Sequence, residues 1–207
     1  MIAVYSPLLA LRTVTVDGTI RVDSAEIRAA VDDQLGTPLA LLDYGRITRR
    51  LAALPLIRSY VTEAVPPDTL LIHVVERQPV GQVRSAAGYK LLDPAGVTVQ
   101  ESAERVAGVP LIDLGSASVN DPSFAAAVRV LVALPASLLP KVDSITARTQ
   151  DDVSLVLSGI GQSVRWGSGD DSMAKATLLD ALIKVTDPAQ PGQFDVSAPS
   201  NGIFRPS

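Results

Sequence analysis

The segment Val61–Val80 constrains the fold more than any other part of the chain. Two runs rich in β-branched residues flank the turn Pro66-Pro67-Asp68, and the second run ends in Glu76-Arg77-Gln78-Pro79. This pattern predicts a β-hairpin closed by a proline-containing turn. A hairpin of this kind, preceded by short helices, is suited to pairing strand edges with partners rather than to catalysis.

Two short helices are predicted upstream of the hairpin. The alternating run of residues 12–18 ends at a glycine and predicts a first strand. Asp23 predicts a helix start, and the apolar face of that helix extends to Leu35. Asp43 predicts the start of a second helix, which Pro55 ends.

The order strand–helix–helix–strand–strand predicts a compact α+β unit in which two helices cover one face of three strands. The second strand is expected at the edge of the sheet, because polar side chains along residues 58–64 blunt an exposed edge. The edge residues that we expect a partner to meet are Arg58, Tyr60 and Thr62.

After Gln78 the pattern changes to short β runs separated by turn signals. Helices are predicted to begin at Asn120/Asp121 and at Asp170/Asp171. The pattern predicts a second, mostly antiparallel β domain with helices on one face. We expect the boundary near residues 75–79, without a long linker. The expected strands are Val80–Arg84, Tyr89–Leu92, Val97–Gln100, Leu111–Leu114, Ser144–Thr149, Ser154–Leu157, Gln162–Trp166 and Gln193–Ala198.

Composition excludes several classes of function. The net charge of −4 argues against a nucleic-acid binder, and the absence of cysteine removes thiol catalysis, thiolate metal sites and disulfides. No run of 18 apolar residues is present to span a bilayer. The apolar start, Met1–Leu11, is open to two interpretations: a loose leader before the first strand, or the outer end of a membrane anchor that this chain does not include.

The residues that could carry chemistry do not form a catalytic or ligand-binding pattern. His73 is the only histidine, so neither a zinc site nor a histidine-based triad has its supporting residues. The Gly159–Gly161 and Gly167–Gly169 segments lack the Lys-Ser/Thr of a phosphate loop. We therefore expect no catalytic residue, no metal ligand, no cofactor and no small-molecule substrate. Solvated or capping roles are expected for the acidic pairs Asp32-Asp33, Asp151-Asp152 and Asp170-Asp171, and a core role for Trp166.

The motifs of the chain, taken together and in order, resemble the FtsQ/DivIB family of bacterial cell-division proteins over residues 6–204. The hairpin with its Glu-Arg-x-Pro ending is the most specific of them. The others are Val14-x-Val16-x-Gly18, Gly36-Thr-Pro-Leu39, Leu54-Pro55-x-Ile57, Leu91-Leu92-Asp93-x-x-Gly96-Val97, Leu111-Ile112 and the spaced Gly167, Lys175 and Leu179.

The resemblance implies a non-enzymatic, single-pass protein of the inner (plasma) membrane at the division septum, with this region on the extracytoplasmic side. It implies a membrane-proximal leader at residues 1–11, a POTRA domain at 12–77, a β domain at 78–198 and a C-terminal tail at 199–207. The transmembrane helix would lie outside this chain. The implied partners are FtsB and FtsL, and through them FtsW and FtsI, which synthesise septal peptidoglycan.

In the family, the last strand of the β domain is an open edge that takes an added strand from FtsB. The matching segment here is Gln193–Ala198. The resemblance therefore implies that Phe194, Val196 and Phe204 contribute to FtsB binding. Ala198 stands where the family has the first of two aromatic residues, so that part of the contact differs here.

Two other classes of function remain as alternatives. A POTRA-containing component of an envelope protein assembly or secretion system would carry several such units or a membrane barrel, and only one unit is visible here. An extracytoplasmic hydrolase would need a clustered acid, base or nucleophile, which the sequence does not show.

Overall fold

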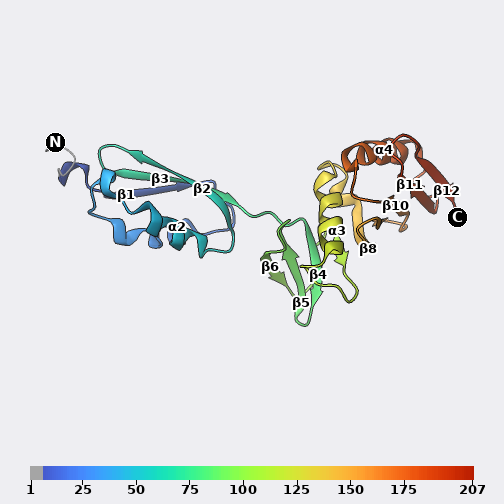
Figure 1. The fold of residues 1–207 in the computed structure, drawn as a ribbon, viewed down its shortest axis with the longest axis horizontal. Coiled ribbons are helices and arrows are strands. Elements are labelled where there is room, and N and C mark those ends of the chain that lie inside the picture. Colours follow the sequence, from blue (N-terminus) through green and yellow to red (C-terminus); the bar gives the residue numbers. More distant parts are fainter. Residues whose placement is uncertain (1–6) are drawn as a thin grey trace. The chain divides into compact units, whose positions relative to one another are not determined.

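The computed structural model describes residues 7–207. The chain divides into two units, residues 1–77 (unit 1) and residues 78–207 (unit 2), each with its own hydrophobic core. Figure 1 shows the strands and helices of unit 1 in blue to teal, and the larger sheet of unit 2 in green to red.

Unit 1 contains a three-stranded sheet in the order β1-β3-β2. Strand β1 (Thr13–Asp17) runs parallel to the central β3 (Thr69–Glu76), and β2 (Ile57–Val65) runs antiparallel to β3. Helices α1 (Ser24–Ala29) and α2 (Tyr44–Ala52) lie between β1 and β2 in the chain, with 3-10 turns at Asp32–Gln34 and Leu39–Leu41. A further 3-10 turn, Pro7–Leu9, precedes β1. The predicted element order is confirmed.

The alternation along β3 decides which face of this sheet is covered. Leu70, Ile72 and Val74 are buried among the helix residues of the core, whereas the intervening side chains point to the opposite face. The side chain of Asp43 accepts a hydrogen bond from the Arg46 N–H (2.9 Å), so the predicted start of α2 is confirmed.

Helix α1 is shorter than the sequence pattern predicts. Its cap, Asp23, accepts a hydrogen bond from the Ala25 N–H (2.8 Å), but the α-helix ends at Ala29. The chain then tightens into the 3-10 turn at Asp32–Gln34, and Leu35 is half exposed. The prediction that one apolar helix face continues to Leu35 is wrong, because this turn changes the helical period after α1.

Residues 1–6 of the expected leader lie outside the described residues. At the other end of that leader, Leu11 is buried in the core of unit 1, and its N–H donates to the Thr37 carbonyl (2.9 Å). Ala10 forms an isolated bridge with Pro38. The folded unit therefore includes the last residues of the segment expected as a leader.

Unit 2 is built on a nine-stranded sheet in the order β12-β11-β10-β9-β8-β7-β4-β5-β6. Five of its neighbouring pairs are antiparallel and three are parallel. Two longer helices, α3 (Pro122–Ala133) and α4 (Ser172–Val185), accompany the sheet. Its strands are β4 (Gly81–Ser85), β5 (Gly88–Leu92), β6 (Thr98–Ser102), β7 (Leu111–Asp113), β8 (Val142–Thr149), β9 (Asp152–Leu157), β10 (Ser163–Gly167), β11 (Gly192–Asp195) and β12 (Ile203–Pro206).

Chain handedness explains why both helices lie on one face of this sheet. The connections β7–α3–β8 and β10–α4–β11 each join neighbouring parallel strands, and both step toward the β12 edge. The four strands that they join point the same way, because two antiparallel steps separate β8 from β10. Right-handed crossovers in the same direction place their helices on the same face. Helices α3 and α4 contact each other accordingly.

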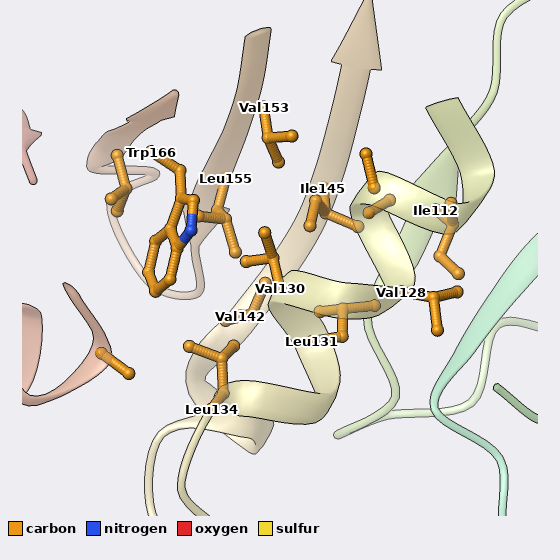
Figure 2. Close-up of a cluster of buried hydrophobic side chains, with 14 of the residues drawn as sticks. Ile112, Val128, Val130, Leu131, Leu134, Val142, Ile145, Val153, Leu155 and Trp166 are labelled. Carbon is orange, nitrogen blue, oxygen red and sulfur yellow. The ribbon is translucent and has the colours of Figure 1, made fainter. Parts of the chain in front are cut away.

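Figure 2 shows the core that this arrangement buries. Val130 and Leu131 of α3 and Leu134 just after it lie against side chains of the central strands, and the indole of Trp166 occupies the same cluster. Trp166 is fully buried, and its Nε1–H donates to the Ser172 hydroxyl at the start of α4 (3.2 Å). The predicted core role of the single tryptophan is confirmed.

Candidate partner-binding edges

The C-terminal end of the chain supplies the outermost strand of the large sheet. Strand β11 pairs in parallel with β10 on one side and antiparallel with β12 on the other. The prediction that Gln193–Ala198 is an open edge is therefore wrong, because both sides of β11 are already paired. The segment expected as a tail, residues 199–207, contains the edge strand instead.

A signal for β12 was present in the sequence. The turn residues Pro199-Ser200-Asn201-Gly202 precede the short apolar pair Ile203-Phe204. The Asn201 N–H donates to the Ala198 carbonyl (3.2 Å), which reverses the chain and brings β12 alongside β11. That signal is weak, because the run has only two apolar residues.

An aromatic pair and a glycine hold β12 in place. The rings of Phe194 and Phe204 lie opposite each other across the two strands, with centroids 4.7 Å apart and planes tilted by 45°. Gly192 faces this pair so closely that an added Cβ would lie 2.6 Å from the Phe204 ring and 2.5 Å from the Arg205 carbonyl oxygen. The close approach of the two strands therefore depends on a glycine at this position.

A carboxylate links the three outer strands electrostatically. Asp195 of β11 lies 3.7 Å from the Arg165 guanidinium of β10 and 3.5 Å from that of Arg205 on β12. Burial raises the pKa of Asp195, but hydrogen bonds from Ser197 and the two guanidinium groups lower it by more. The pKa of Asp195 thus lies below its ordinary value, and the carboxylate is ionised at neutral pH.

The four residues expected to bind FtsB occupy three different environments. Phe194 and Val196 are fully buried, so a partner cannot touch their side chains without opening the core. Phe204 is half-buried on β12, and Ala198 is exposed in the preceding turn. Of the expected set, only Ala198 and Phe204 are therefore accessible to an approaching strand.

The second candidate edge lies in unit 1, where β2 is an outer strand. Arg58 is exposed, whereas Tyr60 and Thr62 are half-buried and lie on the helix side of the sheet. The Tyr60 hydroxyl donates to the Thr48 hydroxyl of α2 (2.6 Å), which ties the edge strand to that helix. Tyr60 thus packs on the helix side of the sheet. A partner at this edge would meet the main chain of β2.

The isolated histidine lies on the helix-free face of unit 1. His73 Nδ1 is 2.8 Å from the Asp17 carboxylate on β1, and Nε2 is 3.8 Å from that of Glu63 on β2. These side chains are all substantially exposed. Within residues 7–207, no three His, Cys, Asp or Glu side chains are grouped to hold a metal ion.

The three acidic pairs lie in different local structures. Asp33 contacts Arg46 (2.8 Å) and Arg50 (3.4 Å) on α2, and Asp152 begins β9. Asp171 is the residue before α4 and has φ 52°. Each pair therefore has its own local setting: an ion-paired turn, the start of a strand and the start of a helix.

The sequence pattern did not reveal the role of Glu76, which lies at the end of β3. This carboxylate is buried and accepts hydrogen bonds from the Ile20, Arg21 and Val22 N–H groups at 2.7–3.1 Å. Burial raises the pKa of Glu76, but the three backbone donors and the Arg21 side chain lower it by more, so its pKa lies below the ordinary 4.5. Glu76 therefore anchors the turn between β1 and α1 to the end of the hairpin.

Among the described residues, none of the helices is both long and apolar enough to cross a bilayer.

Comparison with known proteins connects these two units to one family. Residues 9–77, which make up almost all of unit 1, match the model of the POTRA domain, FtsQ-type. The fold of that unit, with two helices on one face of three strands, agrees with this match.

Curated relatives cover both units. Cell division protein FtsQ of Streptomyces collinus is 35% identical over 94% of this chain and 77% of its own length. The Streptomyces coelicolor protein of the same name is 34% identical over 90% of this chain and 74% of its own length. The Mycobacterium leprae protein is 34% identical, but this chain spans only 57% of its length. The chain therefore belongs to the FtsQ family of cell division proteins.

Proposed function

We propose that this chain is a non-enzymatic scaffold of the division machinery, which binds FtsB and FtsL by strand addition on the outer side of β12. Through them it connects early division proteins with FtsW and FtsI and so helps to control septal peptidoglycan synthesis. The observation that carries the proposal is the position of β12 as an outer strand of the large sheet, paired on one side only among residues 7–207.

The chemistry of an outer strand suits this role. In an antiparallel sheet, about half of the main-chain N–H and C=O groups of an edge strand point away from its neighbour. A partner strand can bond to these groups, while side chains along the edge select the partner. On β12 the half-exposed Ile203 and the half-buried Phe204 offer the apolar contacts.

The proposal includes anchoring in the plasma membrane, with both units on the extracytoplasmic side at the septum. Its support is family membership and the apolar residues that lead into unit 1. The membrane-spanning segment would lie outside the chain described here. The family membership also favours division over the alternative of envelope protein assembly or secretion.

Binding to the extracytoplasmic FtsB–FtsL segments tests the proposal. We expect Phe204→Ala to weaken binding about tenfold, because loss of a central aromatic contact typically costs about 1–2 kcal/mol. We expect Ile203→Lys to weaken it as well, because a charged side chain blunts an edge strand. Fluorescence anisotropy with a labelled FtsB segment measures both.

The matched control is Gln100→Ala on β6, the strand at the opposite edge of the same sheet. It should bind like the parent. Trp166 fluorescence reports whether each variant keeps the core of unit 2. Parent-like affinity of folded Phe204→Ala and Ile203→Lys variants would show that β12 is not the binding edge.

A further inference from the structure

Unit 1 carries an apolar surface at the end where the chain enters it. Three large side chains are exposed there, Leu8, Leu41 and Tyr44, which we call the entry patch. They are three of the eight exposed large apolar side chains of the unit's described residues. The other five are Ile20, Leu35, Val61, Val65 and Val75.

The entry patch borders a shallow apolar hollow of about 350 Å³. Leu9, Leu39, Ala40, Tyr44, Ala64 and Pro66 line it. Tyr44 belongs to both, and Leu8 and Leu41 are each the chain neighbour of a lining residue. The patch and the hollow together join four separate segments: the entry turn, the Leu39–Leu41 turn, the start of α2 and the end of β2. Exposed apolar surface gathered in this way usually marks a contact site.

We propose that the entry patch rests in the interfacial layer of the lipid bilayer. The inference rests on the membrane anchoring proposed above. Pro7–Leu9 leads directly into the patch, and the residues before it are largely apolar in sequence, so a bilayer that held the preceding chain would lie beside this end. Tyrosine and leucine are the side chains that occupy the headgroup boundary.

The charged residues near the patch favour a partner surface without net charge. Arg12 and Arg46 flank it in sequence, and so do Asp43 and Asp68, so the two signs balance. The contact should therefore come from side-chain insertion rather than from attraction to anionic lipid. A few inserted side chains bind a membrane weakly by themselves, so the contact needs the anchor to form.

The experiment therefore tethers the full chain through an N-terminal histidine tag to phosphatidylcholine vesicles that contain a nickel-chelating lipid. Tyr44→Trp places a fluorophore in the patch, and brominated phosphatidylcholine quenches a tryptophan that reaches the bilayer. Buried Trp166 supplies a constant background in every variant. The matched control is Ile20→Trp, a more exposed site beyond the other end of β1, where a tryptophan is at least as open to solvent as at Tyr44.

We expect brominated lipid to quench the Tyr44→Trp variant and to leave the Ile20→Trp variant unchanged. Adding Leu8→Ser and Leu41→Ser to Tyr44→Trp should abolish the quenching. Raising the salt concentration should not reduce it. Equal quenching at both positions, or none at either, would overturn the inference.

Two other occupants of the patch would also overturn it. A second copy would show as a dimer in light scattering that Leu8→Ser and Leu41→Ser dissociate. Cover by residues 1–6 would show, without vesicles, as acrylamide quenching of the Tyr44→Trp variant that rises when those residues are deleted. FtsB binding at β12 is measured independently, so loss of lipid contact with intact FtsB binding refutes only this inference.

Discussion

A single buried carboxylate, Glu76, fixes the turn between β1 and α1 at the residue scale. It accepts hydrogen bonds from three consecutive backbone N–H groups and lies 3.5 Å from the Arg21 guanidinium. The same guanidinium donates to the Arg77 carbonyl, and Arg77 Nε–H donates to the Pro55 carbonyl (3.0 Å). The Glu-Arg pair that identified the family in the sequence thus binds the end of the hairpin to two distant turns.

Replacing Glu76 with glutamine should destabilise unit 1 by about 2 kcal/mol, because a neutral amide accepts the backbone hydrogen bonds more weakly and puts an NH₂ group in place of the second oxygen. Thermal unfolding followed by circular dichroism measures the change. Glu63→Gln is the control, since Glu63 is exposed and its carboxylate lies 3.8 Å from the His73 ring, beyond hydrogen-bond distance. An equal effect of both substitutions would contradict a special role for Glu76.

The effect should depend on pH in a defined direction. The pKa of Glu76 is lower in the folded chain than its ordinary 4.5, so its stabilisation is present above that value and is lost as the pH falls through the folded pKa. The difference in unfolding temperature between parent and Glu76→Gln should therefore be constant near neutral pH and shrink below about pH 4.5.

At the scale of elements, the reliability of sequence prediction followed the strength of the local signal. Helix α2 has a capping aspartate at one end and Pro55 just beyond the other, and both ends were predicted. Helix α1 has a cap but no such stop, so the apolar period was extended too far. Strand β12 has only four residues. It is a strand because it pairs with β11, and its own sequence pattern is too short to predict one.

The site was predicted less well than the fold for the same reason. Whether a strand lies at an edge depends on what pairs with both of its sides, and β11 is paired by segments on either side of it in the chain. The family resemblance assigns Phe194 and Phe204 the same role in partner binding. The structure places one in the core and the other half-buried at the edge.

Gly192→Ala should loosen β12 without unfolding unit 2. The added methyl group would collide with the Phe204 ring and the Arg205 carbonyl, and overpacking of this kind costs roughly 1–3 kcal/mol. Hydrogen exchange of residues 203–206 should accelerate, while the Trp166 fluorescence stays native. Gln193→Ala on the same strand is the control. Unchanged exchange in Gly192→Ala would mean that the two strands accommodate the methyl group without loosening β12.

At the scale of the whole molecule, the two cores share no residue. Leu70, Ile72 and Ile27 are among the buried residues of unit 1, whereas Trp166 and Leu155 belong to the core of unit 2. The single tryptophan therefore reports on unit 2 alone, and circular dichroism reports on both units. This difference makes the thermodynamic independence of the units measurable.

We expect Leu70→Ala to lower the stability of unit 1 by about 2–4 kcal/mol, the usual cost of a cavity at a buried leucine. The circular dichroism transition should shift, and the Trp166 fluorescence transition should not. Leu155→Ala is the matched substitution in unit 2 and should move the fluorescence transition. If Leu70→Ala moves both transitions equally, the units unfold as one.

The strand order of unit 2 also sets the distance across its sheet from β4 to β12. Strand β4, where the chain leaves unit 1, is separated from β12 by six strand-to-strand steps. At about 4.8 Å per step, roughly 30 Å of sheet lies between the two. A strand added to β12 would stand one step further out. The width of the sheet, rather than any linker, would then keep a bound partner away from the joint with the POTRA unit.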